Sequence, residues 1–147
     1  MSEVNNHRIQ FFDNEGNFLG KWGSEGSAEG QFSKPKGLSI DSNDNIYIAD
    51  SANSRVQVFD NGGAFIKTFI SGITAFDIEI DASGNVYVMH MAWGLIYVYD
   101  NQGNYMRKFS LNSDTGIIYG DGFTLDSSGN VYVSVSYTHL RAHETKA

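Results

Sequence analysis

The sequence lacks cysteine, has one proline and contains no long apolar run. The absence of cysteine excludes disulfides and thiol chemistry, but it leaves the compartment open because many secreted β proteins also lack cysteine. No window approaches the length of about 18 apolar residues that a membrane-spanning helix needs. The first ten residues, MSEVNNHRIQ, show no apolar core of a secretory signal. The sequence therefore predicts no membrane segment and leaves the localisation unknown.

Basic residues are also few, with 10 Lys and Arg against 17 Asp and Glu and a net charge of −7. Binding a phosphate backbone requires clustered Lys and Arg, whereas the basic residues here are scattered singly or in pairs. The acidic balance therefore argues against nucleic acid as the main partner and favours a protein or a small ligand.

What the sequence does contain is β-strand chemistry, with 14% aromatic residues and 16 glycines in 147 residues. Residues 32–69 hold four short runs rich in β-branched and aromatic residues, separated by Asp, Asn and Gly turns. We predict that these runs are antiparallel strands of one sheet, with a repeat length that fits a propeller blade. They cover Gly37–Ile40, Asn45–Ala49, Arg55–Phe59 and Ala64–Phe69.

The turns repeat along the whole chain in two interleaved series, each headed by an aspartate. Members of the first series lie 40 and 45 residues apart, and members of the second lie 47 and 40 apart. These structural turns begin at Asp13, Asp41, Asp60, Asp81, Asp100 and Asp126. Each turn mostly offers one carboxylate, so we interpret them as capped hairpin turns rather than calcium loops, which need several acidic positions.

The repeat predicts an all-β fold, a partial β-propeller with about three blades' worth of four-stranded antiparallel sheets. We expect a half blade at 5–22, full blades at 32–70 and 73–111, and a half blade at 117–135. The strands of the first half blade are expected at Arg8–Phe12 and Asn17–Trp22, and those of the last at Gly122–Leu125 and Asn130–Ser134.

The first full blade also resembles a known family. Asp50-Ser-Ala-Asn53-Ser-Arg55-Val-Gln-Val-Phe59, preceded by Pro35-Lys-Gly37-Leu-Ser-Ile-Asp41, is similar to an NHL repeat, as is Asn6-His7-Arg8-Ile9-Gln10. The resemblance implies a β-propeller, usually of six blades closed around a central channel. The second blade departs from the pattern, with His90 in place of Asp50 and Trp93-Gly94-Leu95 in place of Asn-x-Arg.

Three blades' worth of strands predicts a fragment that does not close a ring alone, with open blade edges available for self-association. Residues 136–147 show neither strand patterning nor turn residues, and they resemble translated sequencing adapter of the kind found in metagenomic reading frames. We expect this segment to be a non-native or disordered tail.

The candidate binding residues are Asp77, Glu79, His90 and Trp93. Asp77 and Glu79 occupy inner-strand columns that hold Gly and Ser or Thr in the other blades, and inner strands line the channel. With His90, they are the best acid–base or ligand set in the chain. Trp93 replaces a polar turn residue and is a candidate contact for a protein or glycan, together with Trp22, Tyr97 and Tyr105.

The sequence evidence for other kinds of site is weaker. His139 and His143 have a helical spacing for zinc, but they lie in the tail and lack the metalloprotease order. Gly23, Gly26 and Gly30 lack the Lys-Ser/Thr of a phosphate loop, so we interpret them as the crossing between blades. Arg8 and Arg55 are expected to pair with a turn carboxylate such as Asp50.

Taken together, the sequence favours a non-catalytic propeller scaffold that binds a protein or other ligand through loops and the channel face, without a cofactor or metal. The alternative is a fragment of a six-bladed propeller hydrolase or lyase, lactonase-like or amidating-lyase-like, with a metal site in the channel.

Overall fold

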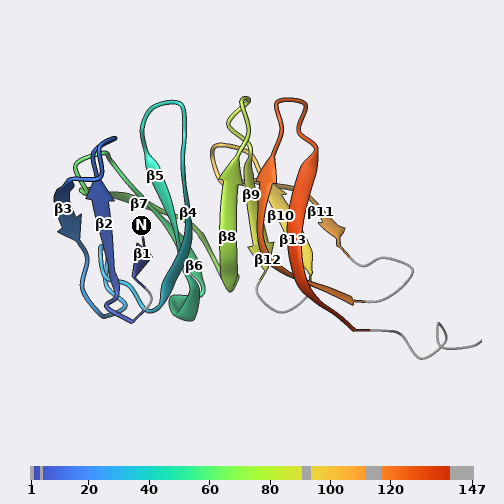
Figure 1. Ribbon diagram of the computed structural model, residues 1–147, viewed down its shortest axis with the longest axis horizontal. Helices are drawn as coiled ribbons and strands as arrows, with labels where there is room; N and C mark the ends of the chain where they lie inside the picture. Colours follow the sequence, from blue (N-terminus) through green and yellow to red (C-terminus); the bar gives the residue numbers. More distant parts are fainter. Residues whose placement is uncertain (1, 4, 91–93, 112–116, 140–147) are drawn as a thin grey trace, which may run out of the picture.

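Short antiparallel strands make up the computed structural model, which describes residues 2–3, 5–90, 94–111 and 117–139 (Figure 1). One turn of 3-10 helix, η1 (Ser51–Asn53), joins β5 to β6. The strands are β1 (Ser2–Glu3), β2 (Arg8–Phe12), β3 (Phe18–Trp22), β4 (Pro35–Ile40), β5 (Ile46–Asp50), β6 (Arg55–Phe59), β7 (Phe65–Ser71), β8 (Ala75–Ile80), β9 (Val86–His90), β10 (Leu95–Tyr99), β11 (Tyr105–Ser110), β12 (Ile117–Leu125) and β13 (Val131–His139).

The strands form four sheets that follow one another along the long axis of the molecule in sequence order (Figure 1). Strands β4–β7 form one four-stranded sheet and β8–β11 form another, each paired in simple sequence order. Strands β1–β3 form a three-stranded sheet at one end, and β12 pairs with β13 at the other. The predicted all-β fold is confirmed.

Strand boundaries agree with the sequence expectation to within a few residues, and β6 coincides with it. Strand β1, which pairs with β2, is not predicted by the sequence pattern. Strands β12 and β13 are longer than expected because their pairing continues from Gly120 outward to Ile117 opposite His139. Residues 136–139, expected to belong to the tail, therefore lie in a strand, and 140–147 lie outside the described residues.

The core lies between the sheets as three apolar clusters. Ile9 of the first sheet packs with Ile48 and Phe59 of the second, and equivalent clusters join the second sheet to the third and the third to the fourth. Apolar residues on both faces of a strand are buried in this way only when a sheet lies on each side. The sequence column Ile9, Val56 and Ile96 is accordingly buried in all three sheets.

The aspartate turns close as predicted, by capping. In the turn that joins β4 to β5, the Asp41 Oδ1 accepts hydrogen bonds from the backbone N–H of Asn43 and Asn45, while Oδ2 accepts one from the Asn45 side chain. The turns at Asp13, Asp81, Asp100 and Asp126 repeat all three bonds, and the Asp60 turn repeats the two backbone bonds. These hydrogen bonds lower the pKa of Asp13, Asp100 and Asp126.

Candidate functional site

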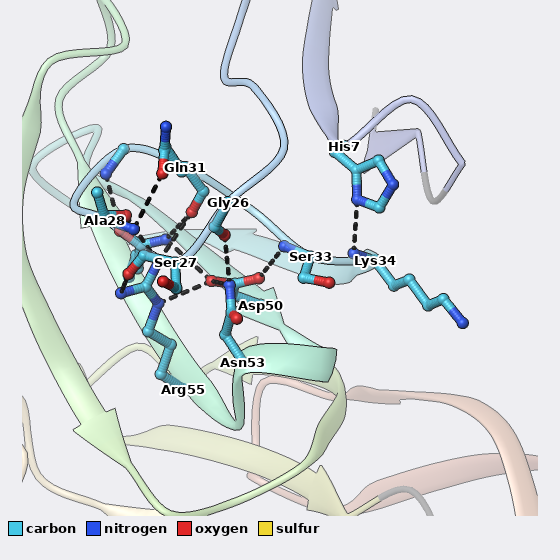
Figure 2. Close-up of polar contacts among 12 residues, drawn as sticks. His7, Gly26, Ser27, Ala28, Gln31, Ser33, Lys34, Asp50, Asn53 and Arg55 are labelled. Atoms are coloured by element: carbon cyan, nitrogen blue, oxygen red, sulfur yellow. Dashed lines mark hydrogen bonds and ion pairs between the residues drawn. The ribbon is translucent and has the colours of Figure 1, made fainter.

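A buried polar cluster around Asp50 fixes the first full blade to the segment that leads into it (Figure 2). The Asp50 carboxylate is fully buried at the end of β5. Its Oδ1 accepts a hydrogen bond from the Ser33 N–H at 2.7 Å, and its Oδ2 accepts bonds from Asn53 at 2.9 Å and from Arg55 Nε at 2.7 Å. The predicted pairing of Arg55 with Asp50 is confirmed.

The same cluster holds the crossing segment 24–33 by its backbone. The Arg55 guanidinium donates hydrogen bonds at 2.9 Å to the carbonyls of Ser27, Ala28 and Gln31. Gln57, also fully buried, donates a further bond to the Gln31 carbonyl. A charged group that is buried with all its partners in place orders a loop, so we assign Asp50 and Arg55 a structural role.

In the described part of the second full blade, 73–90 and 94–111, there is no counterpart of this cluster. Its crossing between β7 and β8 is only residues 72–74, compared with residues 23–34 before β4. His90, Leu95 and Tyr97 stand in the columns of Asp50, Arg55 and Gln57. The second full blade therefore lacks both the long crossing segment and the Asp, Arg and Gln side chains that bind this segment in the first full blade.

The channel face is the surface formed by the inner strands β4, β8 and β12. On β8, the Asp77 carboxylate lies between the other two inner strands. Its Oδ2 accepts a hydrogen bond from the Phe123 N–H at 3.0 Å, and its Oδ1 accepts one from the Ile78 N–H at 2.9 Å. On its other side, β4 approaches so closely that a Cβ on Gly37 would lie 2.5 Å from the Asp77 Cα. Asp77 therefore joins the inner strands of neighbouring sheets.

Glu79 is the second acid of the channel face and lies on the same strand, two residues beyond Asp77. Burial raises the pKa of Glu79, and the charge of Asp77 raises it further. Burial also raises the pKa of Asp77, although the amides of Phe123 and Ile78 act in the opposite direction. Among the described residues, no group donates a hydrogen bond to the Glu79 carboxylate. The structure thus brings together two of the residues predicted from the sequence.

The other two predicted residues are placed differently. His90 ends β9 opposite Ala75, and its ring lies 6.4 Å from that of Tyr97 on β10. Burial lowers the pKa of His90, which favours the neutral imidazole. Trp93 lies outside the described residues.

Of the remaining candidate aromatic residues, one packs between sheets and another is exposed on the surface. Trp22 is half-buried against Phe59, at 6.2 Å between ring centroids, so it contributes to the contact between the first two sheets. Its indole nitrogen is buried without a hydrogen-bond partner among the described residues. Tyr97 lies between His90 and Tyr105, and Tyr105 is exposed.

A groove of about 320 Å³ opens on the side of the aspartate turns, between the two full blades. Its walls include the turn residues Ser42, Asn43 and Ser83, and its floor includes Tyr47 and Val58. No sequence motif indicated it, because the walls come from turns about 40 residues apart that only the stacking of sheets brings together. The groove offers hydroxyl and amide groups together with the charged residues Asp41 and Lys67, and the Asp41 carboxylate is occupied by the hydrogen bonds of its own turn.

Two features are absent from the described residues. No group of three or more His, Asp or Glu side chains there is arranged to hold a metal ion. No helix in the described part of the chain is long and apolar enough to cross a membrane.

Sheets of four antiparallel strands that stack face to face around inner strands define the class of β-propeller proteins, and solved structures support this assignment. The chain is similar to hydrazine synthase from Kuenenia stuttgartiensis, with a TM-score of 0.68 at 18% identity over 92% of this chain and 39% of that chain. It is also similar to a catalytically inactive H270A virginiamycin B lyase from Staphylococcus aureus with quinupristin, with a TM-score of 0.64 at 16% identity over 89% of this chain and 43% of that chain. At these identities the similarity shows the fold alone.

The sequence comparison identifies the repeat itself. Residues 32–59 match the NHL repeat, so the first full blade is an NHL repeat and the resemblance seen in the sequence is confirmed. Over 45 residues the chain is 42% identical to protein lin-41 of Caenorhabditis elegans and 42% identical to protein brain tumor of Drosophila melanogaster. Over 44 residues it is 46% identical to the E3 ubiquitin-protein ligase TRIM71 of Bos taurus. These matches cover about 30% of this chain and 4% to 5% of the relatives' lengths.

The raised pKa of Asp77 leads to a prediction about pH. A carboxyl group whose pKa is raised on folding keeps its proton in the native state at pH values where the unfolded chain has released it. The free energy of unfolding therefore falls as the pH rises from the ordinary value of 3.8 through the raised native value. We expect Asp77→Asn, which cannot ionise, to gain stability relative to wild type as the pH increases through this window.

Urea denaturation of both proteins from about pH 3.5 to about pH 7 checks this expectation. The effect of pH on stability has the opposite sign for the turn aspartates Asp13, Asp100 and Asp126, because their pKa is lowered. Their contribution to the free energy of unfolding is present above pH 3.8 and is lost as the pH falls. They are unchanged in the variant, so their contribution cancels in the difference. A difference between wild type and variant that is constant with pH would contradict the prediction.

Proposed function

We propose that this chain is a non-catalytic propeller scaffold that binds a protein ligand through its loops and channel face, and that Glu79 receives a basic side chain of that ligand. One observation carries the proposal. Glu79 is a half-buried carboxylate that accepts no hydrogen bond from the described residues, and it lies beside a second acid.

The electrostatics of the pair favour a cation. The Asp77 carboxylate already accepts hydrogen bonds from two backbone amides, one on β8 and one on β12, and so links these two strands. Burial and the neighbouring Asp77 charge both destabilise the ionised form of Glu79, and no such hydrogen bonds from the described residues compensate for them. A Lys or Arg side chain placed there would supply charge-assisted hydrogen bonds and offset the repulsion between the two acids. The net charge of −7 also steers a basic ligand toward this chain.

The test is a selection from a random peptide library on immobilised wild-type protein. We expect peptides rich in Lys and Arg, whose affinity for Glu79→Gln falls by about tenfold or more, as expected for loss of one charge-assisted contact. The matched control is Glu15→Gln, an exposed acid in the turn between β2 and β3. Selected peptides that lack basic residues, or that bind Glu79→Gln as tightly as wild type, would show the proposal to be wrong.

The alternative function is a propeller hydrolase or lyase. Burial raises the pKa of Glu79 and lowers that of His90, as for an acid and a base. The two residues lie at opposite ends of the β8–β9 pairing, opposite Tyr87 and Ala75, so each would have to act on a different part of a substrate. The same experiment separates the two functions. Binding through Glu79 predicts that His90→Ala leaves peptide affinity unchanged, whereas the catalytic alternative predicts that wild type turns over a substrate and His90→Ala does not.

A further inference from the structure

The Asp60 turn, which joins β6 to β7, lacks a contact that the other five aspartate turns share. Each of those five has an asparagine four positions after the aspartate, and the side-chain amide of this asparagine donates a hydrogen bond to the carboxylate. The Asp60 turn has Ala64 at this position, so of the three bonds it keeps the two from backbone amides. It is therefore held by one side-chain hydrogen bond fewer than its counterparts.

The same turn contains the only asparagine of the sequence that is followed by glycine, Asn61-Gly62. Both residues are exposed. The Asp100 turn has Asn101-Gln102 at the same positions, and these two residues are exposed as well. Glycine has no side chain to shield its backbone nitrogen, and it adopts the widest range of backbone conformations. The Gly62 nitrogen can therefore approach the Asn61 side chain more easily than the Gln102 nitrogen can approach Asn101.

We propose that Asn61 is a site of spontaneous chemical modification, at which the side-chain amide becomes a carboxyl group by way of a cyclic succinimide. The Gly62 backbone nitrogen attacks the Asn61 Cγ and forms a bond to it, and the bond from Cγ to the side-chain nitrogen breaks. That nitrogen leaves as ammonia and takes the proton of the Gly62 N–H. Water then opens the ring at either carbonyl, which gives aspartate or isoaspartate at position 61. The net reaction consumes one water and releases one ammonia.

The turn itself controls how fast this reaction proceeds. The Asp60 Oδ1 accepts a hydrogen bond from the Gly62 N–H at 2.9 Å, so the nitrogen cannot attack until this bond breaks and the turn opens. Local opening requires less free energy where fewer hydrogen bonds hold a segment. One hydrogen bond fewer raises the population of the open turn by about fivefold. The glycine at position 62 and the missing asparagine at position 64 thus act in the same direction.

The modification would alter the contact between the first two sheets. Trp22 of β3 packs on the Asp60 turn so closely that a Cβ on Gly63 would lie 2.9 Å from the Trp22 ring. Isoaspartate adds a methylene carbon to the backbone after position 61 and so displaces the turn that contacts Trp22. Either product also adds a negative charge to a chain of net charge −7. This inference does not depend on the ligand proposed above.

The test is incubation of the native protein at mildly alkaline pH, followed by mass spectrometry of its peptides and detection of isoaspartate. We expect Asn61 to show the mass change of an amide converted to a carboxyl group, with Asn101 retained as the internal control. Gly62→Gln copies the Asp100 turn and should prevent conversion over the same time. This variant fits the turn, because Gly62 does not have a positive φ and a Cβ there would lie 3.4 Å from the Asp60 Oδ1.

A second variant, Ala64→Asn, tests the control by the turn. It restores the third hydrogen bond, so we expect conversion of Asn61 to slow by about fivefold. Protein unfolded in urea is the reference, because the turn is absent there. Conversion in the unfolded chain but not in the native protein would show that the turn protects Asn61, and the proposal would be overturned. Equal conversion of Asn61 and Asn101, or equal rates for wild type and Ala64→Asn, would also overturn it.

Fluorescence tests the effect on the contact between sheets. The chain has two tryptophans, so Trp93→Phe leaves Trp22 as the only one. In this background we expect the Trp22 emission to shift as isoaspartate accumulates. Asn61→Asp adds the charge without lengthening the backbone and should leave the emission unchanged. An emission that stays constant while isoaspartate accumulates would show that the modification does not reach the contact with Trp22.

Discussion

Replacing Asp50 with alanine is expected to lower the free energy of unfolding by about 4 kcal/mol, because breaking a buried ion pair leaves its partner charge uncompensated. The substitution deprives Arg55, Asn53 and the Ser33 amide of their acceptor. Since Arg55 also holds segment 24–33 through three carbonyls, the loss extends to the contact between the first two sheets. Such a loss is a large share of the 5–15 kcal/mol typical of a folded domain.

Urea denaturation followed by circular dichroism measures this loss. The control is Glu29→Ala, an exposed acid in the same crossing segment, for which we expect a change within about 0.5 kcal/mol. We also expect proteolytic cleavage within 24–33 to precede global unfolding in Asp50→Ala, because the segment loses its anchor. A variant as stable as wild type would mean that water replaces the carboxylate, and the structural role assigned to Asp50 would be wrong.

The repeat explains why most of the fold is predictable from the sequence. Aspartate turns set the strand spacing, and apolar columns such as Ile9, Val56 and Ile96 identify strands that pack against a neighbouring sheet. Strand β1 is not predictable from the sequence, because its two residues are too few to show a strand pattern and form a strand only by pairing with β2. Strands β12 and β13 were underestimated because mutual pairing extends them into segments without strand patterning.

The candidate site was predictable only in part. A change of residue type in an inner-strand column pointed to Asp77 and Glu79, and the structure places both on the channel face. No pattern in the sequence indicates that the Asp77 carboxylate accepts a hydrogen bond from the Phe123 amide, because the contact joins residues 46 positions apart. Nor does a sequence column distinguish a buried aromatic from an exposed one, as Phe12 and Phe59 show. Exposure depends on the neighbouring sheet rather than on the residue.

The spacing between the inner strands leads to the second large effect. A Cβ at Gly37 would lie 2.4 Å from the Asp77 Oδ1, 2.5 Å from its Cα and 3.0 Å from the Phe76 carbonyl oxygen. Two of these three atoms belong to the backbone of β8, so β4 and β8 would have to separate. We expect Gly37→Ala to lower the free energy of unfolding by about 2–3 kcal/mol, the range for overpacking a rigid site.

Gly122 provides the matched control because it occupies the same column on β12. A Cβ there would meet the Asp77 Oδ2 at 3.4 Å, an ordinary contact. Gly122→Ala should therefore change stability by less than about 1 kcal/mol, as for a substitution that creates no clash. Denaturation midpoints of the two variants compare the spacing on the two sides of Asp77 directly. Equal effects would mean that the inner strands can shift to accept a methyl group on either side, and Asp77 would then not fix the distance between neighbouring blades.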